Sequence, residues 1–229
     1  VRCDYNGNWI VRIIMDNILH NDNFMNEIII NRTLGYSRRA LNNYEVGTEY
    51  LIWFANNSSN ILFNRLWKER DEVWLQMRVK FNKGGPTGKP IIINDKEYYP
   101  PKGYSWFVGN DIAQIMYKEG RLKEENGKLF ALIDKSNMTS NWTDIPGYEK
   151  PWEFQTKNSE ILLKRVIEST SDERNLVMDF FLGSGTTTAV AHKLGRKWIG
   201  IEMGEHFWSV ILPRMKKVLF YDKSGISKE

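Results

Sequence analysis

The stretch from residue 176 to residue 202 constrains the fold of this chain more than any other part of it. An apolar run ends in Asp179, a turn with Gly183 and Gly185 follows, and a second apolar run ends in Glu202. Strand, tight turn, helix and second strand in this order are typical of one half of a doubly wound α/β sheet. The pattern therefore predicts strands over 176–179 and 198–202, with a helix over 186–194 between them.

Shorter patterns predict the neighbouring elements. Apolar residues at helical spacing predict a helix capped by Asn8, and β-branched or aromatic runs predict strands over 27–31 and 49–55. Three further helices are expected, over 110–119, 159–169 and 205–220. From 58 to 151 the sequence has turn signals and many aromatic residues but no clean repeat, which indicates an insert or a smaller domain.

The turn after Asp179 predicts a ligand site. An acid at the end of a strand, then Gly-X-Gly and a helix N-terminus, form a crevice where doubly wound folds bind ligands. Glu202 stands about 20 residues further on, where such folds place an acceptor for ribose hydroxyls. Thr188 occupies the third small position of the dinucleotide pattern, and no Gly-Lys-Ser/Thr follows, which excludes a triphosphate P-loop. The residues alone leave an adenosine-type ligand and a purely structural turn open.

Two segments bring a family resemblance. Residues 179–187, Asp-Phe-Phe-Leu-Gly-Ser-Gly-Thr-Thr, and residues 195–202, Gly-Arg-Lys-Trp-Ile-Gly-Ile-Glu, resemble the cofactor motifs of beta-class DNA amino-methyltransferases. Residues 154–162, Phe-Gln-Thr-Lys-Asn-Ser-Glu-Ile-Leu, look like the segment that closes over the cofactor in that class. Two positions depart from the usual pattern, since Phe180 and Asn158 each stand where the family has proline.

The likeness extends along the chain. Residues 21–29, 44–54 and 141–147 look like the modification (Mod) subunits of Type III restriction systems, which as a family methylate adenine at N6. The resemblance implies a partial class I S-adenosylmethionine-dependent methyltransferase: an α/β, Rossmann-like doubly wound sheet with an inserted target-recognition region. It divides the chain into part of the catalytic half (1–57), a target-recognition insert (58–151) and an S-adenosylmethionine-binding half (152–229).

The resemblance also implies the residues that hold S-adenosylmethionine. They form two groups, one on the glycine turn and the strand after it, and one that closes from the other side. The predicted cofactor-binding residues are Asp179, Phe180, Gly183, Ser184, Gly185, Thr186, Thr187 and Glu202, with Gln155, Thr156 and Lys157 opposite.

Catalysis in this family rests on Asp/Asn/Ser-Pro-Pro-Tyr/Phe/Trp, which frees the lone pair of the exocyclic amine for attack on the methyl group. The chain has two incomplete matches, at 99–102 and 144–148. The first lacks the polar residue and the aromatic residue, and the second lacks the paired prolines. We expect the motif upstream of residue 1, so no catalytic residue is predicted here and the chain is expected to be inactive alone on adenine N6 or cytosine N4.

A methyltransferase must take its target base out of the duplex, which requires a surface that holds double-stranded DNA. The net charge of +4, from 32 basic and 28 acidic residues, is too small to decide this. Two acid-free stretches are candidates for phosphate contacts, with a solvated turn as the alternative for the second. The predicted DNA-binding residues are Arg32, Arg38 and Arg39 in the first and Arg78, Lys80, Lys83 and Lys89 in the second.

Composition argues against several other classes of protein: disulfide-bonded, membrane-spanning, secreted and metal-binding ones. A single cysteine, Cys3, permits no intrachain disulfide and suits a reducing cytoplasm. No apolar run approaches the roughly 20 residues of a membrane span, and because Val1-Arg2-Cys3-Asp4 lacks a basic region followed by an apolar one, we do not expect this start to be a signal peptide. His192 and His206 lack ligands at metal-binding spacing, so no metal site is predicted.

Three function hypotheses follow. The first is a cytoplasmic methyltransferase part that binds DNA, a restriction (Res) subunit and a second Mod copy. The second is a non-enzymatic DNA-binding or specificity module, or a remnant of one. The third, a nicotinamide oxidoreductase, lacks the small residue at Thr188 and a recognisable acid/base pair.

Overall fold

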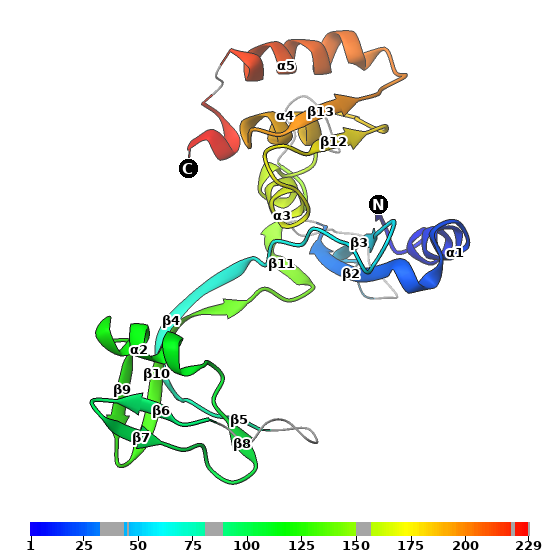
Figure 1. Cartoon of the computed structure of the whole chain (residues 1–229). Helices are drawn as coiled ribbons and strands as arrows, with labels where there is room; N and C mark the ends of the chain where they lie inside the picture. Colours follow the sequence, from blue (N-terminus) through cyan, green and yellow to red (C-terminus); the bar gives the residue numbers. More distant parts are fainter. Residues whose placement is uncertain (33–43, 45, 81–88, 150–156, 221–222, 229) are drawn as a thin grey trace. The chain divides into compact units, whose positions relative to one another are not determined.

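The computed structural model describes residues 1–32, 44, 46–80, 89–149, 157–220 and 223–228. It divides into two compact units (Figure 1). Unit 1 combines Val1–Leu66 with Met138–Glu229, and unit 2 is Trp67–Asn137. Unit 2 lies inside the range 58–151 that we expected to be an insert, and each unit has a hydrophobic core of its own.

The first sheet of unit 1 has four strands in the order β1-β3-β2-β11. The strands are β1 (Arg2–Cys3), β2 (Phe24–Asn31), β3 (Thr48–Phe54) and β11 (Asn141–Pro146), and helix α1 (Asn8–Leu19) follows β1. The first three strands pair antiparallel, whereas β11 runs parallel to β2. This confirms the predicted helix and both predicted strands, but the cap was predicted wrongly: Gly7 takes the N-cap position, and Asn8 is the first helical residue.

The second sheet of unit 1 is a parallel pair of strands, as the pattern predicted. Its elements are β12 (Leu176–Asp179), α4 (Thr186–Lys193) and β13 (Lys197–Gly200), with α3 (Glu160–Thr170) before them. After β13 come the π-helical turn η2 (Phe207–Ile211) and α5 (Leu212–Leu219). Leu182, Ala189, Ile211, Met215 and Val218 form the core between the turn, α4 and α5.

Two boundaries differ from the sequence prediction. The helix expected over 205–220 begins at Phe207 as a π-helical turn and becomes α-helical only at Leu212. Pro213 explains the interruption, because proline has no N–H to donate to the preceding turn. Strand β13 ends at Gly200, two residues earlier than expected, so Glu202 lies in the loop beyond the strand.

A buried acid, Glu160, joins four segments of unit 1. Its side chain is only 5% exposed and pairs with Lys193 of α4 at 2.9 Å and with Arg214 of α5 at 3.1 Å. It also accepts the backbone N–H of Ile226, in the C-terminal turn η3 (Gly225–Lys228), at 3.1 Å. A buried carboxylate is tolerated when several donors satisfy it, and this one has two cations and a backbone N–H.

A second buried acid, Glu49, ties β1 and β3 to the segment after β11. Glu49 accepts hydrogen bonds from Arg2 at 2.8 Å and from the hydroxyl of Tyr148 at 3.0 Å. The guanidinium of Arg2 lies over the Tyr148 ring and also donates to the carbonyl of Gly147 and to the amide of Asn158. Arg2 therefore fixes both ends of the segment between Gly147 and Asn158.

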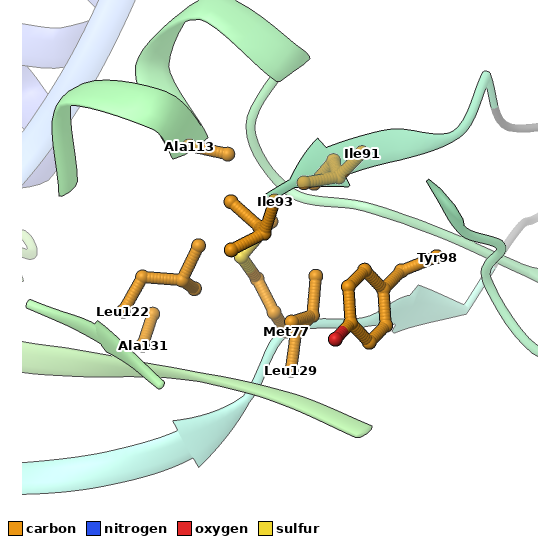
Figure 2. Packing of buried hydrophobic residues seen from close by; sticks show 8 residues of the cluster. All are labelled: Met77, Ile91, Ile93, Tyr98, Ala113, Leu122, Leu129 and Ala131. Atoms are coloured by element: carbon orange, nitrogen blue, oxygen red, sulfur yellow. The ribbon is translucent and has the colours of Figure 1, made fainter. Parts of the chain in front are cut away.

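Unit 2 packs a helix and a hairpin against a three-stranded antiparallel sheet of order β4-β10-β9. The strands and helix are β4 (Trp67–Gln76), β5 (Val79–Lys80), β6 (Ile91–Ile93), β7 (Lys96–Tyr98), β8 (Tyr104–Ser105), α2 (Asn110–Lys118), β9 (Leu122–Glu125) and β10 (Lys128–Asn137). Figure 2 shows the core side chains converging between α2, the hairpin and the sheet. Only α2 was predicted, because these strands lack a period of two.

Gly147 offers a test of the packing in unit 1. A Cβ atom here would overlap the carbonyl oxygen of Asn31 and lie 3.1 Å from a nitrogen of Arg2. We expect Gly147→Ala to lower the free energy of unfolding by about 1–3 kcal/mol, the usual cost of overpacking. The matched control is Gly47→Ala, because a Cβ at Gly47 meets nothing within 4 Å. Denaturant unfolding of both variants checks this, and equal stability of the two would contradict the packing.

Candidate functional site: the glycine turn and Glu202

The turn between β12 and α4 needs glycine at two positions. Gly183 and Gly185 have φ angles of 58° and 77°, in the left-handed region that other residues rarely adopt. Gly185 stands directly before the first residue of α4, and its N–H bonds the carbonyl of Leu182 at 2.9 Å. The two glycines therefore turn the chain sharply from the carboxyl end of β12 into the helix.

Asp179, the last residue of β12, holds this turn together. One carboxylate oxygen accepts the N–H of Phe181 at 3.1 Å, and the other accepts the hydroxyl of Thr187 at 2.5 Å. The acid thus links the end of the strand to the first turn of α4. Both predicted residues, Asp179 and Thr187, lie at the turn and bond one another there.

Glu202 meets the turn from the end of β13. Its carboxylate accepts the N–H of Gly183 at 2.8 Å and the N–H of Gly204 at 2.9 Å. These backbone donors, Gly204 first and then Gly183, hold the pKa of Glu202 below its ordinary value. The carboxylate therefore stays ionised at neutral pH, and its hydrogen bonds stabilise the fold until the pH falls through that lowered pKa.

The Glu202 carboxylate retains capacity for a ligand. Its side chain is 16% exposed, and an ionised carboxylate offers about four lone-pair sites. The N–H groups of Gly183 and Gly204 use two of them, the Met203 backbone adds a weaker contact, and a ring nitrogen of His206 lies 3.5 Å from one carboxylate oxygen. Hydroxyl groups of a ligand can occupy the remaining sites. The geometry thus brings an acceptor for hydroxyls and a turn with two glycines to the same edge of the parallel pair.

Two aromatic rings stand beside this edge. Phe180 is 60% exposed and Phe181 is 81% exposed, and their ring centroids lie 5.1 Å apart. Large exposed rings are unusual unless they meet a partner, and a flat aromatic face suits a purine. The prediction included Phe180 but missed Phe181, which the same run of sequence could have supplied.

Ser184 and Thr186, two further predicted residues, have buried side chains that bond other protein groups. Their hydroxyl oxygens lie 3.0 Å apart. Arg214 donates to the Ser184 carbonyl and to the Thr186 hydroxyl, each at 2.9 Å. These contacts with α5 hold the backbone of the turn in place. The sequence analysis missed Arg214, because nothing in its local pattern links it to the turn.

The predicted closing segment is described only at its end. Gln155 and Thr156 lie outside the described residues, while Lys157 pairs with Glu149 at 2.6 Å. Burial alone would raise the pKa of Glu149, but hydrogen bonds from Lys157 and from the N–H of Glu160 outweigh it and hold that pKa below its ordinary value. Lys157 is thereby anchored next to the start of α3.

The predicted DNA-binding residues fall into three groups. Arg32 is half-buried in unit 1 and lies 3.6 Å from Glu49. Arg38, Arg39 and Lys83 lie outside the described residues. Arg78, Lys80 and Lys89 are exposed in unit 2, where the Arg78 guanidinium also lies 4.9 Å from the ring centroid of Tyr104.

The described residues provide neither a metal centre nor a reactive thiol. They contain no group of three or more His, Cys, Asp or Glu side chains arranged to hold a metal ion. Cys3 is half-buried, and burial raises the pKa of its thiol, so it is a poor nucleophile. None of the helices in the described part of the chain is long and apolar enough to cross a membrane.

Comparison with known proteins places this geometry in a family. Residues 1–212 match the family described as DNA methylase. The chain is 34% identical over 148 residues to the "Probable type III restriction-modification enzyme HindVI Mod subunit" of Haemophilus influenzae, covering 58% of this chain and 19% of that protein. It is 48% identical over 174 residues to the Type II methyltransferase M1.MboII of Moraxella bovis, covering 76% and 55% respectively.

A solved structure shares the fold. The crystal structure of the M1.HpyAVI-SAM complex matches with a TM-score of 0.50 and 17% identity, over 93% of this chain and 71% of that one. The matched regions amount to between about a fifth and about half of the two curated relatives. The family match nevertheless covers 212 of the 229 residues, which shows the family of this chain. The chain belongs to the DNA methylase family.

Proposed function

We propose that this chain is the S-adenosylmethionine-binding and DNA-contacting part of a DNA methyltransferase of a restriction-modification system. One observation carries the proposal: the Glu202 carboxylate accepts the N–H of Gly183, so that the acid and the glycine turn meet at the carboxyl edge of β12 and β13. Doubly wound folds bind nucleoside ligands at this edge. The fold shared with M1.HpyAVI, whose crystal structure is a SAM complex, agrees with it.

In this proposal the adenosine part of the cofactor lies across the edge of the parallel pair. Glu202 accepts hydrogen bonds from the ribose hydroxyls, and the exposed ring of Phe180 packs on the adenine. Asp179 and Thr187 keep the turn in shape, and Gln155, Thr156 and Lys157 close from the opposite side. The bound cofactor supplies an activated methyl group, while the residues of this chain bind and orient it.

The target and the partners belong to the same proposal. The enzyme methylates adenine at N6, with cytosine N4 as the second candidate, in the cytoplasm. Unit 2 is the target-recognition part, within the proposed insert 58–151, between a catalytic part (1–57) and a cofactor part (152–229). A Res subunit and a second Mod copy are the proposed protein partners.

A second function, a non-enzymatic DNA-binding module, has one observation in its favour. Arg78, Lys80 and Lys89 are exposed on a unit that has its own core, so DNA contact requires no cofactor. This function predicts duplex binding that weakens with salt and no heat on addition of S-adenosylmethionine.

Glu202 gives the first test. Replacing Glu202 by Gln removes the charge that strengthens hydrogen bonds to ribose hydroxyls, each worth about 1.5–3 kcal/mol. We expect the dissociation constant of S-adenosylmethionine to rise at least about tenfold in isothermal titration. The control is Glu205→Gln, which alters an exposed acid in the same loop. Unaltered binding of S-adenosylmethionine by the Glu202 variant would show that Glu202 does not contact the cofactor.

The basic residues of unit 2 give the second test. Replacing Arg78, Lys80 and Lys89 together by Ala should weaken duplex binding. It should also flatten its salt dependence, because each lost phosphate contact lowers the slope of log K against log salt by about 0.9. The control replaces Lys216, Lys217 and Lys223, three exposed lysines of unit 1, and makes the same change in charge. Fluorescence anisotropy over a salt series measures both, and an equal loss in the two triple variants would argue for charge alone.

Methyl transfer gives the third test. Because residues 1–229 contain no complete Asp/Asn/Ser-Pro-Pro-aromatic motif, we expect no transfer of labelled methyl groups from S-adenosylmethionine to duplex DNA by the isolated chain. A scintillation assay with a complete methyltransferase as positive control measures it. Turnover by this chain would mean that its catalytic residues follow another pattern.

A further inference from the structure

A cation on α5, Arg214, contacts the glycine turn. Arg214 of α5 donates from one guanidinium nitrogen to the carbonyl of Ser184 and to the hydroxyl of Thr186, at 2.9 Å each. Ser184 is the residue between the two glycines with left-handed backbone, Gly183 and Gly185. The position of its carbonyl sets the orientation of the peptide plane between Ser184 and Gly185, so Arg214 acts on the most bent part of the turn.

Glu160 holds Arg214 in place. The second terminal nitrogen of Arg214 bonds Glu160 at 3.1 Å, and the side chains are 17% and 5% exposed. A planar guanidinium that bonds acceptors on two sides has little freedom to rotate. Arg214 is therefore fixed between the turn and the first residue of α3.

Glu160 is also bonded to Glu149, which pairs with the predicted cofactor-binding residue Lys157. The backbone N–H of Glu160 donates to Glu149 at 3.1 Å, and Glu149 pairs with Lys157 at 2.6 Å. Lys157 belongs to the segment that we propose closes over the cofactor. A series of contacts thus links Lys157 to the glycine turn: Lys157 pairs with Glu149, Glu149 accepts the backbone N–H of Glu160, and the Glu160 side chain pairs with Arg214.

We infer that Arg214 is a positioning residue for the cofactor, which fixes the glycine turn and links it through Glu160 to Glu149 and Lys157. The inference rests on the proposed function, since it concerns the same site. Arg214 does not need to touch the cofactor: it acts through Ser184 and Thr186. Glu160 also bonds Lys193 at 2.9 Å, so loss of Arg214 leaves this buried carboxylate paired. The turn should consequently loosen while the core keeps its shape.

The experiment compares Arg214→Gln and Arg214→Lys with a matched control, Arg165→Gln. Arg165 of α3 bonds both oxygens of Asp144 at 2.9 Å, and its side chain is 16% exposed, close to the 17% of Arg214. The 229-residue chain is titrated with S-adenosylmethionine. We expect the dissociation constant to rise at least about tenfold in the Gln variant, less in the Lys variant, and less than about twofold in the control.

A second readout needs no cofactor. The N–H groups of Gly183 and Gly185 bond Glu202 and the carbonyl of Leu182. We expect Arg214→Gln to speed their hydrogen exchange at least about fivefold relative to wild type, and Arg165→Gln to leave it unchanged. A purely structural role for Arg214 would instead lower the melting temperature of the Arg214→Gln variant without a selective increase in exchange at the two glycines.

The outcomes separate the inference from the function it rests on. If wild type binds no S-adenosylmethionine, the proposed function fails, and selective exchange at the two glycines still decides whether Arg214 holds the turn. If wild type binds and the Arg214→Gln variant binds equally well, the inference is overturned. Should that variant not fold, Thr186→Val, which removes one acceptor of Arg214, replaces it and is expected to weaken binding about threefold or more.

Discussion

The hydrogen bond from the Gly183 N–H to Glu202 is the interaction on which the site depends. It joins the turn after one parallel strand to the acid beyond the next, and so brings both to the same edge of the sheet. The bond is possible because two glycines accept left-handed backbone and because β13 lies next to β12 in register. A side chain at either glycine would strain the turn, because both have φ angles in the left-handed region.

Buried charges organise unit 1 around this edge. Glu160 gathers α3, α4, α5 and the C-terminal turn, and Glu49 gathers β1, β3 and the segment after β11. A buried ion pair is an expensive way to gain stability, since desolvation offsets much of the attraction. It does fix which segments meet and in what orientation. In this chain the fixed orientation benefits the glycine turn, because Arg214 is bonded both to Glu160 and to the carbonyl of Ser184.

Sequence patterns predicted the parallel pair, its connecting helix and the acid near the end of each strand, because glycine conformations and strand–turn–helix order are local properties. They did not predict the strands of unit 2, because apolar and polar residues do not alternate cleanly along this part of the sequence. Pro213 signalled the interruption of the last helix but not that its first turn would be π-helical. The roles of Arg214 and Glu160 were not predicted for a different reason. These two residues lie 54 positions apart in the sequence, and Arg214 and Ser184 lie 30 positions apart. Such pairs follow from the packing of whole elements, which a single sequence does not display.

The most direct measurement of the central claim is a crystal structure of this chain grown with S-adenosylmethionine. The account predicts ribose hydroxyls within hydrogen-bond distance of the Glu202 carboxylate, with the rest of the ligand passing over Gly183 and Gly185 against Phe180. A structure in which the chain's own side chains fill that space, with the ligand bound elsewhere, would contradict it.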